Sequence, residues 1–126
     1  MKRIINSENA PPPIGPYSHS VLAEGKLLFI SGQIPFDKDG NQVGTEIVEQ
    51  THQCIKNLIA IVEQAGGKIT DIVKTTVLLN DMANFAKMNE VYNSYFENSK
   101  PARVAYQVCK LPKDVLVEID AIACLD

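Results

Sequence analysis

The sequence contains no tryptophan, and aromatic residues make up only 6% of its 126 positions. Aliphatic side chains must therefore form most of the core, and Val and Ile together number 24 against 9 Leu. Because stiff β-branched side chains favour pleated surfaces, a substantial β-sheet is expected. Hydrophobic residues at 45% and charged residues at 21% exclude a disordered chain, and the length predicts one domain over residues 1–126.

Cysteine is scarce as well, and long apolar runs are missing. Cys54, Cys109 and Cys124 form no CxxC pair. Such an odd, unclustered set is typical of reduced thiols, so we expect an intracellular, cytoplasmic protein. No apolar stretch has the length of a signal peptide core or approaches the roughly 20 residues of a membrane span. We therefore expect no secretion signal and no membrane partner.

Clusters of positive charge are also absent, since the net charge is -3 and the Lys and Arg residues are scattered. Binding to a phosphate backbone needs clustered cations, so nucleic acid is a disfavoured partner. His19 and His52 are isolated and do not have the spacing of a metal site. No GxSxG, GxGxxG or GxxxxGKS motif occurs, so neither a serine hydrolase nor a nucleotide site is indicated.

Hydrophobic periodicity predicts two helices among several strands. Thr45 is the expected N-cap of the first helix, Gly66-Gly67 its stop, and Asp81 the cap of the second. The expected strands are 17–23 and 27–31, joined as a hairpin, then 72–79, 102–109 and 115–124, and the expected helices are 45–65 and 81–96. With a further short strand expected before the first helix, this order predicts an α+β fold with a mixed six-stranded sheet and both helices on one face.

Alternation along the last two strands predicts what the uncovered face of that sheet carries. Period-2 geometry directs Arg103, Gln107, Glu118 and Asp120 away from the helices. Apolar residues of the final strand share that face. A surface of this mixed character suits an oligomer interface with polar pockets.

Two charged residues on these strands could carry chemistry. Arg103 is one of only two arginines and could bind a substrate carboxylate or phosphate with its two-pronged guanidinium. It could equally form an ion pair with Glu118, Asp120 or another subunit. Glu118, which is unusual within a strand, could orient a water or act as a general base, or could simply be solvated or ion-paired.

Several motifs together resemble the RidA/YjgF family of reactive-intermediate (enamine/imine) deaminases, in order and along essentially the whole chain. These motifs are Asn9-Ala10-Pro11, Ile14-Gly15-Pro16-Tyr17, Ser31-Gly32-Gln33-Ile34-Pro35, the stretch 71–77, Pro101-Ala102-Arg103 and the stretch 111–123. The resemblance implies a chorismate-mutase-like α+β fold and a homotrimer whose sheets form a central barrel, with clefts between subunits. It also implies hydrolysis of 2-aminoacrylate or 2-iminobutyrate to a 2-keto acid and ammonia without a cofactor.

The resemblance further assigns roles to individual residues. Arg103 would grip the substrate carboxylate, and Glu118 would hold the attacking water. The remaining substrate-binding positions that it implies are Tyr17, Ser31, Gly32, Asn89 and Ala105.

Ala105 is a departure from the family pattern, because many bacterial members carry a cysteine there; its backbone N–H could serve instead. Two other functions stay open, a non-catalytic regulator that binds ketoacids and an RNA-cleaving translation inhibitor.

Overall fold

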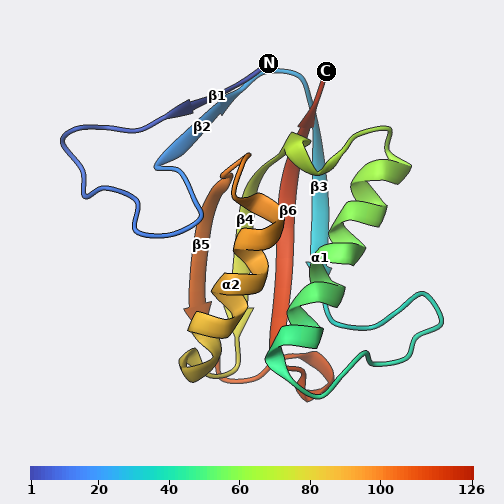
Figure 1. Ribbon diagram of the computed structural model, residues 1–126. Helices are drawn as coiled ribbons and strands as arrows, with labels where there is room; N and C mark the ends of the chain where they lie inside the picture. Colours follow the sequence, from blue (N-terminus) through green and yellow to red (C-terminus); the bar gives the residue numbers. More distant parts are fainter.

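Six strands and two α-helices form the regular structure, which a computed structural model describes over residues 1–126 (Figure 1). The elements are β1 (Lys2–Ile5), β2 (Ser20–Ala23), β3 (Lys26–Gln33), α1 (Ile47–Gln64), β4 (Ile72–Leu79), α2 (Phe85–Phe96), β5 (Ala102–Gln107) and β6 (Val117–Leu125). Short 3₁₀ turns lie before β4, α2 and β6. The predicted α+β class is confirmed, as are the bounds of β4.

The strands form two sheets rather than the single six-stranded sheet that was predicted. One sheet has the order β3-β6-β4-β5, with β4 and β5 parallel, and the other pairs β1 with β2. A single parallel bridge between Ser18 and Ala102 links them. The sheet is therefore mixed, as expected, but β1 and β2 diverge from it (Figure 1).

The predicted hairpin between the segments 17–23 and 27–31 is wrong. β2 pairs with the N-terminal strand β1, and β3 pairs with the C-terminal strand β6. The turn at Gly25 explains the difference, because it has φ +149° and lies against the Leu125 carbonyl, where a Cβ would overlap. β3 therefore pairs with β6 instead of folding back on β2.

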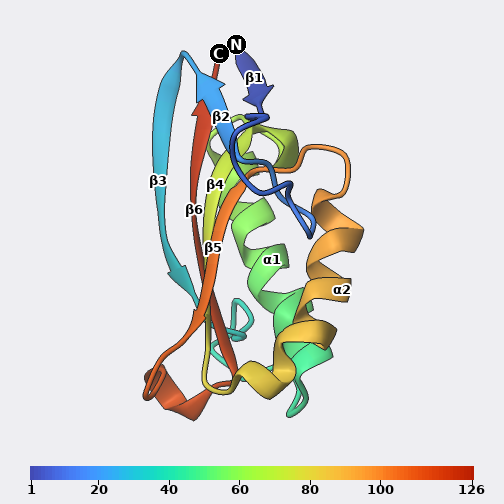
Figure 2. The same ribbon diagram turned by 90° about the vertical axis from the view of Figure 1, so that its left-hand side faces the viewer.

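Both helices cover the same face of the four-stranded sheet, as predicted (Figure 2). α1 buries one face, and the glycine stop is confirmed by Gly66 at φ +90°. Thr45 is not the N-cap, which falls at Glu46 without a side-chain hydrogen bond. Asp81 does cap the turn before α2, since its Oδ1 accepts from the Ala83 N–H over 2.9 Å.

The two faces of the sheet differ sharply in burial. Beneath the helices, alternate residues of β6 are fully buried, namely Val117, Ile119, Ala121 and Ala123. No segment of the chain covers the other face (Figure 2). There Phe29 is 71% exposed and Tyr106 is 48% exposed.

The predicted orientation of Glu118 and Asp120 agrees with this division, but that of Arg103 and Gln107 is wrong. Arg103 is in register with Thr75, which is buried beneath the helices, so both side chains lie on the helix-covered face. Gln107 accepts a hydrogen bond from the Met82 N–H at the entrance to α2. Val104 and Tyr106, which alternate with Arg103 and Gln107 along β5, lie on the open face although they are apolar.

Candidate active site

A cavity of about 250 Å³ lies where β5, the start of α2 and the proline-rich loop before β2 meet. It brings together four of the predicted site residues, Tyr17, Asn89, Arg103 and Ala105. Three further residues line it that the sequence did not single out for the site, Ile14, Gly15 and Phe85. Residues from three distant parts of the sequence therefore converge on one small site.

Arg103 is the one charged residue that lines this cavity. Its guanidinium carbon lies 4.8 Å from the Tyr92 ring centroid, 5.4 Å from that of Tyr17 and 5.6 Å from that of Phe85. Aromatic faces attract a cation at these distances. The Nη1 group donates to Oδ1 of Asn89 over 2.6 Å. The chain has only four Phe and four Tyr residues, and three of them surround this guanidinium.

Arg103 has no carboxylate partner. The ion pairs of the chain are Met1–Asp126, Lys2–Asp71 and Lys110–Asp114. Burial lowers the pKa of the Arg103 guanidinium, and the phenols of Tyr92 and Tyr17 partly oppose that shift. Arginine still carries its proton at neutral pH. A half-buried cation surrounded only by neutral groups can bind an anion.

Tyr92 fixes one wall of the guanidinium site from within the core. It is fully buried, and its hydroxyl lies 2.7 Å from the hydroxyl of Thr75. Burial raises the pKa of Tyr92 to about 12, although the Thr75 hydrogen bond opposes the shift. The phenol therefore stays neutral and supplies a fixed aromatic face.

Gly15 leaves the guanidinium accessible. A Cβ at this position would lie 3.3 Å from the Tyr17 ring and 3.5 Å from Nη2 of Arg103. A larger side chain would fill the space beside Nη2. The glycine thus keeps open the edge of the guanidinium that Asn89 does not occupy.

The other predicted site residues lie on the opposite, open face of the sheet. Glu118 pairs in register with Leu78 and alternates with the buried Val117 and Ile119, so its side chain faces away from Arg103. Gly32 lies directly against it, since a Cβ there would overlap the Glu118 carboxylate. Ser31 is exposed beside that glycine. The alternative in which Arg103 forms an ion pair with Glu118 or Asp120 is therefore excluded within one chain.

Phe85 and Gly15 were missed as site residues for different reasons. Phe85 is apolar and lies outside the motifs, and its contact with Arg103 depends on how α2 crosses β5. Gly15 belongs to a motif that was noted for its resemblance, and its neighbour Tyr17 was the residue expected to form the wall.

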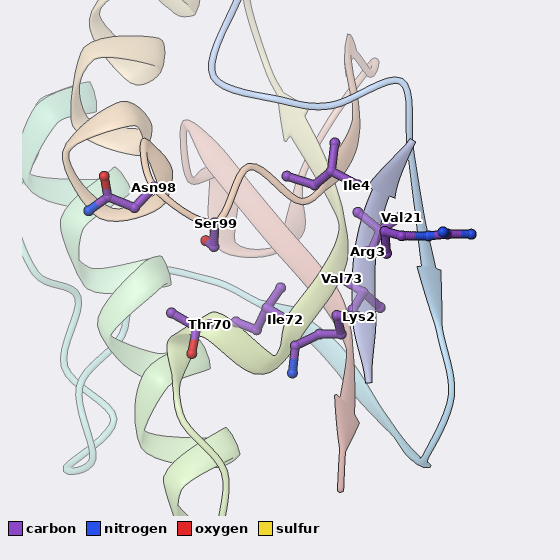
Figure 3. Close-up of a pocket in the computed structure, with 9 residues that line it drawn as sticks. All are labelled: Lys2, Arg3, Ile4, Val21, Thr70, Ile72, Val73, Asn98 and Ser99. Atoms are coloured by element: carbon purple, nitrogen blue, oxygen red, sulfur yellow. The ribbon is translucent and has the colours of Figure 1, made fainter. Parts of the chain in front are cut away.

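A larger cavity of about 480 Å³ lies beneath the β1–β2 ribbon, next to the start of β4 (Figure 3). Its cationic residues do not create an anion site. The Nζ of Lys2 is 2.6 Å from a carboxylate oxygen of Asp71 and also donates to the Cys124 carbonyl. The Arg3 side chain points away from the other lining residues (Figure 3).

The remaining reactive side chains offer no alternative centre. No group of three His, Cys, Asp or Glu residues could hold a metal ion. All three cysteines are free thiols, and burial raises the pKa of Cys54 far above its usual range. Nδ1 of His52 is hydrogen-bonded to the Tyr95 hydroxyl over 2.8 Å.

Neither α-helix has the length and apolar character that crossing a membrane requires.

Known proteins match this chain over almost its whole length. The family model described as Endoribonuclease L-PSP matches residues 7–125. A RutC family protein of Pyrococcus horikoshii is 58% identical over 124 residues, which are 98% of this chain and 98% of that protein. The 2-iminobutanoate/2-iminopropanoate deaminase of Mus musculus is 45% identical over 124 residues, which are 98% of this chain and 91% of that protein.

Among solved structures, E. coli TdcF with bound serine superposes with a TM-score of 0.76 and 38% sequence identity. The match covers 98% of this chain and 99% of that chain. Fold, sequence and relatives agree with the resemblance seen in the motifs, and the chain belongs to the RidA/YjgF family.

Proposed function

We propose that the chain hydrolyses small 2-imino acids and their enamine forms, such as 2-iminobutyrate and 2-aminoacrylate, to 2-keto acids and ammonia. The observation that carries the proposal is the Arg103 guanidinium, which faces a cavity of about 250 Å³ without a carboxylate partner. A substrate carboxylate would supply the missing anion. The mouse relative is named for this reaction, and the TdcF structure holds an amino acid, which has the same carboxylate.

In this proposal Arg103 binds the carboxylate through two parallel charge-assisted hydrogen bonds. Asn89 already accepts one Nη1 proton, which sets the plane of the guanidinium. Tyr17 forms a wall of the site, and the small cavity favours a short side chain on the substrate. Ala105 shares the Arg103 face and contributes its backbone N–H, so the missing family cysteine does not abolish the reaction.

Glu118 would hold the attacking water. The water oxygen forms a bond to C2 of the imine while a carboxylate oxygen of Glu118 takes up its proton. The C=N electron pair moves to nitrogen, which takes up two protons, the one held by Glu118 and the one lost from the new C2 hydroxyl. It leaves as ammonia as the C2 carbonyl forms. The reaction consumes one water, releases one ammonia and needs no oxidant or cofactor.

Since Glu118 and Arg103 lie on opposite faces of one sheet, we propose that each site takes Arg103 from one copy and Glu118 from a neighbour. Ser31 and Gly32 lie beside Glu118 and would complete the second wall. A homotrimer would place the open faces together around a central barrel, with three such clefts. The exposed apolar side chains on that face support this assembly, because self-association removes them from water.

The test couples a threonine dehydratase to the purified chain. The dehydratase releases 2-iminobutyrate, and 2-ketobutyrate formation is followed with and without micromolar protein. The expected result is a faster rate that saturates with protein and is absent with Arg103→Ala. Equal rates with and without the protein would refute deamination.

Two results would favour the other functions considered for this family. Saturable ketoacid binding without turnover would indicate a regulator. RNA cleavage that survives Arg103→Ala and repeated purification would indicate the activity named in the family description. The net charge of -3 does not favour the latter.

A further inference from the structure

A long loop connects β1 to β2 (Figure 1). His19, which immediately precedes β2, is hydrogen-bonded to three residues in the first part of this connection. Its backbone N–H donates to Oδ1 of Asn6 over 2.8 Å. The Ser7 N–H donates to its Nδ1 over 2.9 Å, and its Nε2 is hydrogen-bonded to the Pro11 carbonyl. A single residue thus connects three points of the loop to the start of the strand.

These partners define the protonation state of the ring. A backbone N–H can only donate, so Nδ1 of His19 must carry a lone pair. A carbonyl can only accept, so Nε2 must carry the proton. The neutral ring with its proton on Nε2 is the only form that satisfies both contacts. Protonation of Nδ1 would set two N–H groups against each other.

The same loop forms part of the Arg103 cavity, to which it contributes Ile14 and Gly15. Four of the seven residues from 10 to 16 are prolines, which have no N–H to donate. The far end of the loop is held independently, because the Ser18 hydroxyl donates to the Lys100 carbonyl over 2.6 Å. Residues 7 to 11 of the loop therefore depend on His19 for their attachment to β2. Ile14 and Gly15 are also hydrogen-bonded to Tyr17, over 3.4 Å and 2.8 Å.

We infer that His19 is a pH-sensitive positioning residue for the Arg103 site. The neutral ring holds residues 7–11, and the stiff proline run that follows carries this constraint to Ile14 and Gly15, which line the cavity beside the guanidinium. Protonation breaks the Ser7 hydrogen bond and loosens that wall, which weakens binding of the substrate carboxylate. This inference rests on the proposed function. Histidine side chains change charge between about pH 5 and 8, so the change falls within an accessible range.

The groups that contact the ring and backbone of His19 are neutral. The charged residues of the loop and of β1 are Glu8, Lys2 and Arg3, and none of them forms an ion pair or hydrogen bond with His19. From the segment after α2, Glu97 and Lys100 line a neighbouring cavity with Asn6 and Tyr17. The Ser7 and Pro11 contacts therefore account for the coupling between the ring and the loop.

The binding test measures the Kd for 2-ketobutyrate, which stays an anion throughout, between pH 8 and pH 6. We expect the Kd of the unchanged chain to rise about fivefold, the equivalent of one hydrogen bond. His19→Gln cannot titrate and should give a flat profile. His52→Gln, which removes the only other histidine, should retain the rise. A rise that survives in His19→Gln would overturn the inference.

A second measurement does not depend on ligand or turnover. Nitrogen-15 spectra of the His19 ring should show the proton on Nε2 at pH 8, and the Ser7 and Gly15 amide signals should shift as the ring titrates. A proton on Nδ1, or Ser7 and Gly15 amide signals that do not change with pH, would overturn the inference that His19 positions the loop. If the spectra agree but 2-ketobutyrate binds at no pH, the proposed function fails and the role at the Arg103 site fails with it.

Discussion

The two faces of the four-stranded sheet are each incomplete, and in opposite ways. The helix-covered face is dry and well packed, but it holds Arg103 among aromatic rings with no anion to balance it. The open face carries the carboxylate of Glu118 and leaves Phe29 71% exposed. One face therefore has a cation without an anion, and the other has a carboxylate and exposed apolar side chains without a covering layer. In the proposed mechanism both groups serve one site, and a second copy of the chain would be needed to bring them together.

A comparison of two cations supports the same conclusion. Lys2 is half-buried and its charge is balanced by Asp71 at 2.6 Å. Burial disfavours the ionised form of Asp71, but hydrogen bonds from Lys2 and the Lys68 N–H outweigh it and lower the pKa of that carboxyl. The fold therefore pairs a half-buried cation with a carboxylate in one place and leaves Arg103 unpaired in another.

The largest expected effect is on the helix-covered face. Arg103→Ala should lower kcat/KM for imine hydrolysis at least about 100-fold, since it removes two charge-assisted hydrogen bonds. Arg103→Lys should recover little, because a point charge lacks the two-pronged geometry. Arg3→Ala, which changes the only other arginine, is the matched control and should leave kcat/KM unchanged. Activity within threefold of the unchanged chain in Arg103→Ala would remove that face from the mechanism.

The second prediction joins the two faces. Arg103→Ala and Glu118→Gln should each be inactive alone, and mixed trimers of the two should recover about a quarter of the activity. Each cleft would take its two groups from different chains, so one in four clefts in a random mixture is intact. The mixture is made by joint refolding, and the rate of ketoacid formation is measured. No recovery would mean that both groups act from the same chain.

The third prediction concerns cover for the open face. Phe29→Asp should raise the dissociation constant of the assembly at least about tenfold, because it places a charge in an apolar contact. Sedimentation velocity at several protein concentrations measures the change. Val48→Asp alters a 40% exposed residue of α1 and should leave the assembly intact. An assembly that tolerates Phe29→Asp would show that another surface associates.

The smallest expected effect is on the free energy of unfolding, in a comparison of one tyrosine from each face. Tyr92→Phe removes the buried hydrogen bond to Thr75 and should cost about 1 kcal/mol in the free energy of unfolding. Tyr106→Phe removes an exposed hydroxyl with no hydrogen bond in the chain and should cost less than about 0.5 kcal/mol. Urea denaturation of both variants gives the difference. Equal losses would mean that the Thr75 contact contributes nothing to stability.

Local patterns predicted much of the fold because they report on neighbours in sequence. The bounds of β4, the buried stripe of α1 and the Asp81 cap each depend on a few adjacent residues. Strand partners depend on distant segments, which is why β2 was paired with the wrong strand. The prediction of which side of β5 meets the helices was wrong for a related reason, since Val104 and Tyr106 are apolar but are not buried within one chain.

The candidate site divides in the same way. The sequence by itself determined which groups are present: one internal arginine, a glutamate within a strand, a proline-rich loop and the family to which these motifs belong. Only the tertiary structure decided where they act, because the register between β4 and β5 sets the side of the sheet that each side chain occupies. That register places Arg103 beneath α2 and Glu118 on the open face, which is why we propose that a second copy of the chain brings the two groups together.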